Sequence, residues 1–255
     1  MNERAVTETL VSPSVWRVDD GCALFAGPLQ HNDLHRHSVP VFLAGLYDRF
    51  RLRIDGTDWT TCRSAVVPAG TRYEFDMRGD PLAVVYVEPD RASADALTPL
   101  VADAFELGGA FVGHGGETAT LRTLYENRSD PSAMWALKDL MQFYSTRARR
   151  TIDVRIARAV AALQSDSPAV VPVRELAALA GLSSSRFQHL FTEQVGVPYR
   201  RYRAWNRLRT AIREVIAGAN YTTAAHAAGF ADQAHFSREF RRTFGGPASR
   251  GLRPS

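Results

Sequence analysis

Histidines in the N-terminal half of the chain are the side chains best suited to metal chemistry. Three of them lie close together in the sequence, at positions 31, 35 and 37. His35 and His37 are two residues apart, so a strand would place both rings on one face. Because imidazole is a common metal ligand, this cluster makes a metal site one hypothesis for this half.

Other groups that could carry catalysis are weakly indicated. The sequence has no Gly-x-Ser-x-Gly motif, no phosphate-binding loop and no dinucleotide fingerprint. Glu74, Asp76 and Glu88 fall near the ends of expected strands, where carboxylates are usually solvated. Cys22 and Cys62 are too few for a disulfide framework and are interpreted as reduced thiols. We therefore predict no catalytic residue.

A second group of side chains that could form a binding site lies in the C-terminal half, within Val173–Gly196. Ala177 and Gly181 are four residues apart, a spacing that lets two helices approach each other and turn. Ser183 is suited to cap the second helix. Apolar residues recur every three or four positions along that helix and predict a buried face. The polar residues expected to enter a DNA major groove are Ser184, Ser185, Arg186, Gln188 and His189.

The same pattern recurs 48 residues later. Ala225 and Gly229 repeat the four-residue spacing, and the helix that follows carries three phenylalanines on one face. Two such units, each followed by an amphipathic helix with a polar outer face, indicate a duplicated helix-turn-helix far more strongly than one unit does. The residues expected to face DNA here are Gln233, His235, Arg238, Arg241 and Arg242.

The arginines are concentrated in the C-terminal half. Residues 147–255 contain 18 arginines and seven acidic residues, a net charge of +11, whereas residues 1–146 carry a net charge of −7. A basic module joined to an acidic one indicates a polyanionic partner, nucleic acid first. Between the repeated units, Tyr199–Ile216 is an Arg-rich amphipathic stretch that would fix their separation. The arginines in or near it that are expected to contact DNA phosphates are Arg200, Arg201, Arg203 and Arg209.

Residues 153–253 resemble the DNA-binding domain of AraC-type transcription regulators. The stretches that carry the resemblance are RELAALAGLSSSRFQHLF, the run RLRTA at 207–211, and AAHAAGFADQAHFSREFRRTFGGPAS. The resemblance implies seven helices, two helix-turn-helix units, and two recognition helices in successive major grooves. In the second unit, Ala224 replaces a large aliphatic residue of the family pattern and Ala231 replaces a capping serine. Asp232 could cap instead, but we expect the second unit to be the less stable one.

The N-terminal half is expected to be rich in strands. Over residues 16–88, short apolar or alternating stretches are separated by turn signals, which is typical of a sandwich or barrel. Together with the histidine pair, the run at 68–73 resembles a cupin, a small β-barrel that often precedes this DNA-binding domain. In metal-binding cupins the pair is joined by a glutamate and a further histidine. Here those positions hold Val41 or Phe42 and Tyr73, so neither metal nor cofactor is predicted.

Without a metal, the inward side chains of this domain have two interpretations. They line a pocket for a small molecule, or they fill the domain interior. The residues predicted to bind a ligand are His35, His37, Tyr73, Phe42 and Tyr47.

The sequence therefore predicts an α+β chain of two domains. Residues 1–147 would form a cupin-like β-barrel with following helices, and residues 151–255 an all-α domain with two helix-turn-helix units. The predicted function is a sequence-specific DNA-binding transcription regulator that responds to a small-molecule effector and is not an enzyme. The alternative is a cupin-type enzyme fused to a DNA-binding domain, which a stoichiometric transition metal in the purified protein would favour.

The expected partners are double-stranded promoter DNA and a small-molecule effector, with RNA polymerase as a further candidate. Helices around residues 117–147 are expected to support a homodimer. No apolar run approaches the ~20 residues of a membrane helix, and the N-terminus has no long apolar segment of a secretory signal. A cytoplasmic location is therefore expected.

Overall fold

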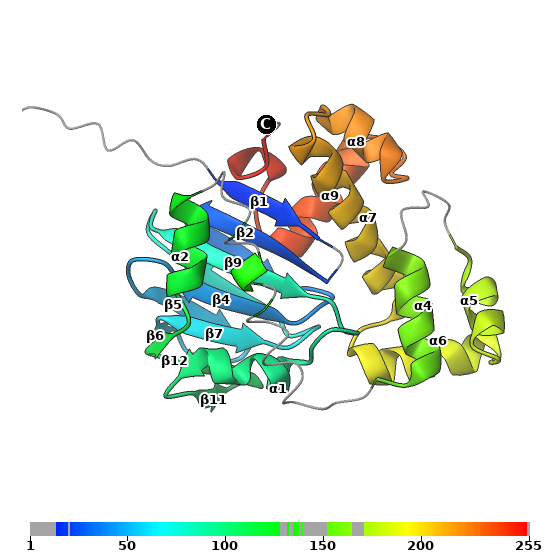
Figure 1. The fold of residues 1–255 in the computed structure, drawn as a ribbon, viewed down its shortest axis with the longest axis horizontal. Coiled ribbons are helices and arrows are strands. Elements are labelled where there is room, and N and C mark those ends of the chain that lie inside the picture. Colours follow the sequence, from blue (N-terminus) through cyan, green and yellow to red (C-terminus); the bar gives the residue numbers. More distant parts are fainter. Residues whose placement is uncertain are drawn as a thin grey trace, which may run out of the picture.

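The structure is a computed structural model and describes residues 14–19, 21–127, 132, 135–137, 139, 152–164 and 171–253. Strands dominate up to residue 116, and the elements described beyond residue 118 are helices (Figure 1). No helix in these ranges is both long enough and apolar enough to cross a bilayer.

Two antiparallel sheets make up most of the N-terminal part. The larger one contains, in spatial order, β1 (Val15–Val18), β2 (Cys22–Pro28), β9 (Pro81–Val87), β4 (Val41–Gly45), β7 (Ser64–Val67), β12 (Ala110–Gly113) and β11 (Phe105–Leu107). The smaller one contains β3 (His31–His35), β8 (Tyr73–Asp76), β5 (Phe50–Ile54) and β6 (Thr60–Cys62). A short pair, β10 (Val101–Ala102) with β13 (Gly115–Gly116), stands apart from both.

The β-rich N-terminal domain expected from the sequence is confirmed, although it is not a closed barrel. Among the described strands, no pairing joins the larger sheet to the smaller one, and instead the two sheets share an apolar core. Because side chains alternate along a strand, Val41 and Leu43 of β4 enter this core. Phe42 and Ala44 of the same strand point to the opposite face of the larger sheet.

That opposite face is covered by helices. They are α1 (Ala94–Leu97), the 3-10 helix η1 (Thr98–Leu100) and α2 (Ala119–Glu126). Leu121 and Leu124 of α2 pack with Phe42 in a second apolar cluster, and Figure 1 shows α2 lying across the sheet. The helix expected between Pro131 and Arg147, and the domain boundary expected after it, lie largely outside the described residues.

The C-terminal part is helical, as predicted. Its described elements are α4 (Val154–Gln164), α5 (Val173–Leu179), α6 (Ser184–Val195), α7 (Tyr199–Ile216), α8 (Tyr221–Ala227), α9 (Gln233–Phe244) and the 3-10 helix η2 (Ala248–Arg250). The pairs α5–α6 and α8–α9 form the two helix-turn-helix units, and the 18-residue α7 joins them.

The two units have matching turns. Gly181 and Gly229 adopt left-handed φ angles of 64° and 73°, which glycine reaches without steric cost. The next residue donates its N–H to the alanine four positions before the glycine in each unit, from Leu182 at 2.9 Å and from Phe230 at 2.8 Å. This agreement confirms that the repeated Ala-x-x-x-Gly spacing encodes the same local structure twice.

The helix caps correct one expectation. Ser183 caps α6 as predicted and accepts the N–H of Arg186. Asp232 caps α9 and accepts the N–H of His235 at 2.6 Å. The second recognition helix is therefore capped in spite of Ala231, which removes one of the two reasons for expecting the second unit to be the less stable one and leaves the small Ala224 as the other.

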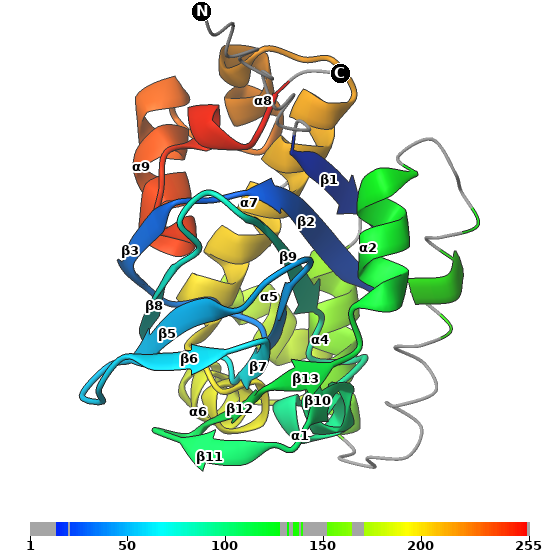
Figure 2. The same ribbon diagram turned by 90° about the vertical axis from the view of Figure 1, so that its left-hand side faces the viewer.

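The helical part packs directly on the sheets. Helix α7 contacts β1, and α9 contacts β3, so the helices of the second unit lie beside the sheet edges in both views (Figures 1 and 2). Two hydrogen bonds join the end of α9 to β3. The side-chain amide of Asn32 donates to the Phe244 carbonyl at 2.7 Å, and the Asp33 N–H donates to the Gly245 carbonyl at 3.1 Å.

Candidate functional site

The first recognition helix, α6, presents the side chains that the sequence predicted. Ser185, Arg186, Gln188 and His189 are exposed, and Ser184 is half-buried. Phe187, Leu190, Phe191 and Val195 form the buried face on the other side. The predicted residues thus share one free polar surface, which is the requirement for a helix that enters a groove.

The second recognition helix, α9, is less free. Gln233 and Arg238 are exposed, while the His235 ring packs edge-on against Phe230 at a centroid distance of 5.2 Å. Arg241 reaches Asp33 of β3 at 3.4 Å. Arg242 pairs with Glu239 on its own helix. All five predicted residues lie on α9, but two of the arginines already have carboxylate partners.

Helix α7 places its arginines in different surroundings. Arg200 is exposed and Arg203 is half-buried. Arg201 is also half-buried, and its pKa is lowered by burial and by nearby Arg36 and Arg242. None of these three side chains is fully buried.

The prediction that Arg209 contacts DNA phosphates is wrong, because its side chain is only 4% exposed and faces the N-terminal sheet. Its guanidinium lies 2.8 Å from Glu88 at the end of β9, and it also donates to the Asp19 carbonyl at 2.6 Å. Arg209 is therefore not available to DNA phosphates in this structure. Helical spacing could have shown this, because Arg209 lies seven residues, about two turns, after the buried Tyr202 and so falls on the same face of the helix.

The expectation that the Glu88 carboxylate is solvated is also wrong, since this residue is buried. Besides Arg209, it accepts hydrogen bonds from the Tyr202 hydroxyl at 2.5 Å and from Trp205 Nε1 at 2.9 Å. Burial raises the pKa of the Glu88 carboxyl, and the charge of Arg209 and these hydrogen bonds oppose that rise. Sequence reasoning missed this junction between sheet and helix because its two halves are more than 100 residues apart.

Arg207 has a role that sequence reasoning also missed. Its guanidinium lies 4.0 Å from the centre of the Phe230 ring. It also donates to the carbonyls of Ala228 and Gly229, at the turn of the second helix-turn-helix unit. Arg207 therefore fixes the second unit to α7.

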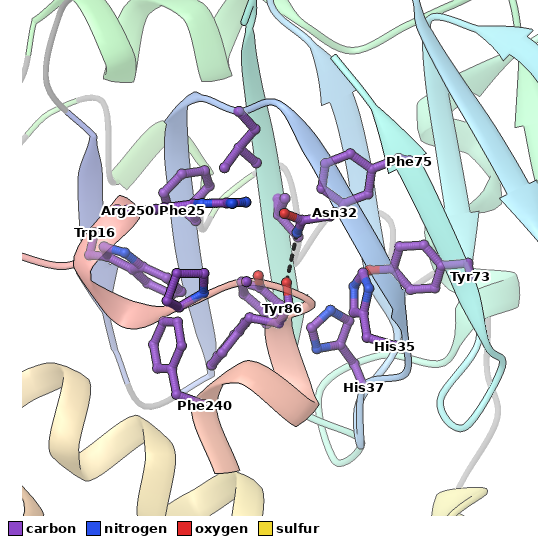
Figure 3. A pocket seen from close by; sticks show the side chains of 16 residues that line it. Trp16, Phe25, Asn32, His35, His37, Tyr73, Phe75, Tyr86, Phe240 and Arg250 are labelled. Carbon is purple, nitrogen blue, oxygen red and sulfur yellow. Dashed lines mark hydrogen bonds between the residues drawn. The ribbon is translucent and has the colours of Figure 1, made fainter. Parts of the chain in front are cut away.

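Three of the residues predicted to bind a ligand come together between the sheets. The His35 ring lies 5.0 Å from His37 and 4.4 Å from Tyr73, measured between ring centres. All three side chains are buried. They line a pocket with about 480 Å³ of empty space, which includes its open mouth (Figure 3).

Both histidines of the pocket are neutral at neutral pH. Burial lowers the pKa of His35 from 6.5 to about 4, although Asp33 opposes this. Burial and the neighbouring His35 lower the pKa of His37 well below its ordinary value. His35 Nδ1 lies 2.7 Å from the Asp33 carbonyl oxygen, which can only accept, so Nδ1 carries the hydrogen and Nε2 is the free acceptor.

Phe42 and Tyr47 are not part of this pocket, which corrects the prediction. Phe42 belongs to the opposite face of the larger sheet, as the alternation along β4 requires. Tyr47 follows that strand, is 46% exposed, and donates to Glu126 of α2 at 2.7 Å. Tyr47 therefore binds α2 to the larger sheet.

The rest of the pocket wall was not predicted. Part of it belongs to the N-terminal part, and part comes from Phe240 and Phe244 of α9 and from Gly246, Pro247, Arg250 and Gly251, which follow that helix (Figure 3). Gly245 marks the closest approach, because a Cβ there would lie 2.6 Å from the Asp33 carbonyl oxygen and 2.7 Å from His35 Nδ1. The pocket is thus shared between the sheets and the second helix-turn-helix unit.

The histidine cluster does not assemble as a metal site. His31 lies apart from the other two, 3.5 Å from Glu74 and near Trp59. Within the described residues, no three His, Cys, Asp or Glu side chains gather as metal ligands.

Comparisons with known proteins agree with these two parts. Residues 176–253 match the family model of a helix-turn-helix domain. No curated protein matches the chain. Apo ToxT from Vibrio cholerae has a similar structure, with a TM-score of 0.61 at 12% identity over 91% of this chain and 97% of that one.

Wild-type ToxT bound to an unsaturated fatty acid gives a TM-score of 0.60 at 12% identity, over 92% of this chain and 96% of the other. A probable AraC family transcriptional regulator from Rhodopseudomonas palustris is 26% identical over 40% of this chain and all of its own, with a TM-score of 0.36. The C-terminal part of this chain contains a helix-turn-helix domain, and the chain as a whole shares the two-domain fold of ToxT, with a β-rich N-terminal domain.

Proposed function

We propose that this protein is a sequence-specific DNA-binding transcription regulator whose N-terminal domain binds a small-molecule effector. The observation that supports this most is the duplicated helix-turn-helix. Its two units have matching turns, both recognition helices are capped, and α6 offers a polar face with Ser185, Arg186, Gln188 and His189 exposed. The surrounding module carries the positive charge that a DNA-binding domain needs.

In this proposal the two recognition helices read bases and α7 contacts the backbone. Arg186 is the strongest candidate for base reading, because Arg forms a bidentate pair with guanine in the major groove. Arg238 is its exposed counterpart on α9. Arg200, Arg201 and Arg203 supply phosphate contacts, which add affinity without sequence preference.

The effector site in this proposal is the shared pocket. A molecule bound between His35, His37 and Tyr73 would also touch Phe240 and Phe244 of the second recognition helix. Its binding free energy would therefore depend on how α9 sits against β3, and DNA that needs a different placement would compete with it. ToxT, whose structure is known with an unsaturated fatty acid, has the same two-domain fold.

The domain division at residues 147–151 belongs to the same proposal, with a sensor domain before it and a DNA-binding domain after it. Homodimerisation through the helices around 117–147 and contact with RNA polymerase are further parts of it. We favour a regulator over a cupin-type enzyme, because two of the positions that hold metal in such enzymes carry Val41 or Phe42 and Tyr73. Metal analysis of the purified protein tests this choice.

Genome-wide binding of the full-length protein tests the proposal as a whole. Chromatin immunoprecipitation with sequencing should recover a small set of promoters that share one motif, with two groups of specified bases about one helical turn apart. Enrichment that follows DNA abundance alone, with no shared motif, would contradict sequence-specific regulation.

A further inference from the structure

Unpartnered polar atoms gather around the shared pocket. Of the described residues, five have a buried side-chain nitrogen or oxygen without a hydrogen-bond partner, and three of these line the pocket. They are Trp16 Nε1, His37 Nδ1 and the Tyr73 hydroxyl. Each such atom has lost its hydrogen bonds to water without gaining a partner in the protein, which destabilises the empty pocket. A ligand that pairs them would remove this destabilisation.

The chemistry of these atoms restricts the ligand. An indole N–H can only donate, and a phenol hydroxyl can donate as well as accept. A hydrocarbon would leave all three unpaired, so the ligand is expected to carry polar groups that form hydrogen bonds. In Figure 3, Trp16 lies toward one end of the pocket, whereas His37 and Tyr73 lie together at the other. Polar groups are therefore needed at both ends of the ligand.

Charge distinguishes the two ends. Among the described residues that line the pocket there is no carboxylate, and both histidines are neutral. Arg250 supplies the only fixed charge among these residues, and its exposed side chain lies on the same side as Trp16 (Figure 3). An anionic group is therefore stabilised beside Arg250, and only a neutral group is tolerated beside His37 and Tyr73.

The walls restrict the shape of the body between these groups. They consist largely of aromatic rings, and among the described lining residues the aliphatic side chains are those of Leu29, Val84 and Pro247. Trp16 and Tyr86 are stacked with centres 6.0 Å apart, and Phe244 stands edge-on to Tyr86 at 5.7 Å. Such flat faces and edges are complementary to another planar ring.

Resting on the function proposed above, we propose that the effector is a compact planar ring that carries an acidic group at one end and a neutral hydroxyl at the other. The acidic group lies beside Arg250 and Trp16. The hydroxyl lies between His37 and Tyr73, and the ring lies among Phe25, Tyr86 and Phe244. Because Phe244 ends the second recognition helix, the ring touches the DNA-binding unit directly.

Titration calorimetry of the full-length protein tests this class with four probes. 4-Hydroxybenzoate carries both polar groups, benzoate lacks the hydroxyl, phenol lacks the acid, and a 16-carbon unsaturated fatty acid lacks the ring. We expect 4-hydroxybenzoate to bind most tightly, by about tenfold or more over each of the others. Tighter binding of the fatty acid, or no binding of 4-hydroxybenzoate at millimolar concentration, would overturn the proposal.

Three variants assign the two ends. Arg250→Gln should weaken 4-hydroxybenzoate and benzoate by about tenfold and leave phenol unchanged. Tyr73→Phe should weaken 4-hydroxybenzoate several-fold and leave benzoate unchanged. The matched control Arg253→Gln, which replaces an exposed arginine outside the pocket, should change none of them. The assignment would also be overturned if either pocket variant weakened the binding of 4-hydroxybenzoate, benzoate and phenol to the same extent while circular dichroism showed that it was folded.

DNA binding of the same preparations separates this inference from the proposed function. If the protein binds its operator but none of the aromatic acids, the proposed ligand class is wrong, and the proposed function as a transcription regulator is unaffected. If the protein binds aromatic acids but no specific DNA, the proposed function as a transcription regulator is wrong, and the proposed ligand class is unaffected.

Discussion

At the residue scale, the buried histidine pair determines how this protein responds to acid. His35 and His37 lie between the sheets, where protonation would place uncompensated charge among aromatic rings. The unfolded chain has no such penalty, so it binds protons more readily in the range between the folded pKa and the ordinary value. Stability should therefore be fully present above pH 6.5 and should fall as the pH drops toward 4.

The first prediction concerns this slope. With the pKa of His35 at about 4 instead of 6.5, acidification across that range should cost about 3 kcal/mol from His35 alone. Urea unfolding at a series of pH values should show this loss, and His35→Gln should flatten it. His114→Gln, which changes an exposed histidine, is the matched control. An unchanged slope in the His35 variant would show that the ring is not buried as described.

The second prediction concerns the phosphate contacts. Arg200 is exposed at the start of α7. Arg200→Ala should weaken binding to every duplex similarly and lower the slope of log affinity against log salt by about one. Arg72→Ala, which removes an exposed arginine paired with Asp55 on the N-terminal domain, should leave that slope unchanged. A loss confined to one operator position would assign Arg200 to base reading instead.

Of the residues predicted to bind a ligand, His35, His37 and Tyr73 line one pocket, whereas Phe42 and Tyr47 lie elsewhere for a physical reason. The sequence placed both histidines on one strand, but β3 ends at His35 and His37 lies two residues beyond it, although the two ring centres are still only 5.0 Å apart. Phe42 lies on another strand, β4, beyond a loop. No spacing relates the two strands, and β4 turns its even-numbered residues to the opposite face.

At the element scale, the α7–β9 junction joins the two halves of the molecule. Arg209, Tyr202 and Trp205 of α7 all hold the Glu88 carboxylate. Removal of one member of a buried ion pair leaves the other charge without compensation, which is more costly than the loss of a surface pair.

The third prediction follows from that burial. Arg209→Ala should lower the free energy of unfolding by about 3–5 kcal/mol. Arg203→Ala, at a half-buried position on the same helix, should cost about 1 kcal/mol or less. Urea unfolding at pH 7 measures both. The double variant Glu88→Leu with Arg209→Met should recover much of the loss. Equal, small effects of the two single variants would mean that the junction is open in solution.

The elements themselves were largely predictable. The repeated Ala-x-x-x-Gly spacing specified both helix-turn-helix units, because helix period and glycine turns are local properties. The cap of α9 was weighed wrongly, since Asp232 takes the role that Ala231 cannot. The role of Arg209 could not be assigned from charge, because its partner lies at a sheet edge that only the folded chain brings near.

At the scale of the whole molecule, the pocket connects sensing with DNA binding. Its walls combine residues more than 200 positions apart, such as Asn32 and Phe244. Charge asymmetry along the chain predicted two functional halves, but not that the second recognition helix would close the pocket of the first half. That arrangement depends on how the two halves pack, which no local pattern encodes.

The fourth prediction tests the independence of the halves. A fragment of residues 151–255 should fold and bind DNA, although more weakly than the full chain. It would expose Tyr202, Trp205 and Arg209, which the sheet covers in the intact protein, and we expect it to unfold at lower urea concentration. A fragment that is unfolded under conditions where the full chain is stable would contradict a boundary near residue 150.

The central claim is that two recognition helices read two separate groups of bases, and one measurement tests it most directly. Wild type, Arg186→Ala and Arg238→Ala are titrated at fixed salt against a duplex that carries the motif found by chromatin immunoprecipitation. The same titrations are made with every single-base change of that motif. Arg186→Ala should cost about 1–3 kcal/mol and abolish discrimination at one position, and Arg238→Ala should do so about one helical turn away. If both variants weaken binding evenly on all sequences, the helices do not read bases, and the account is wrong.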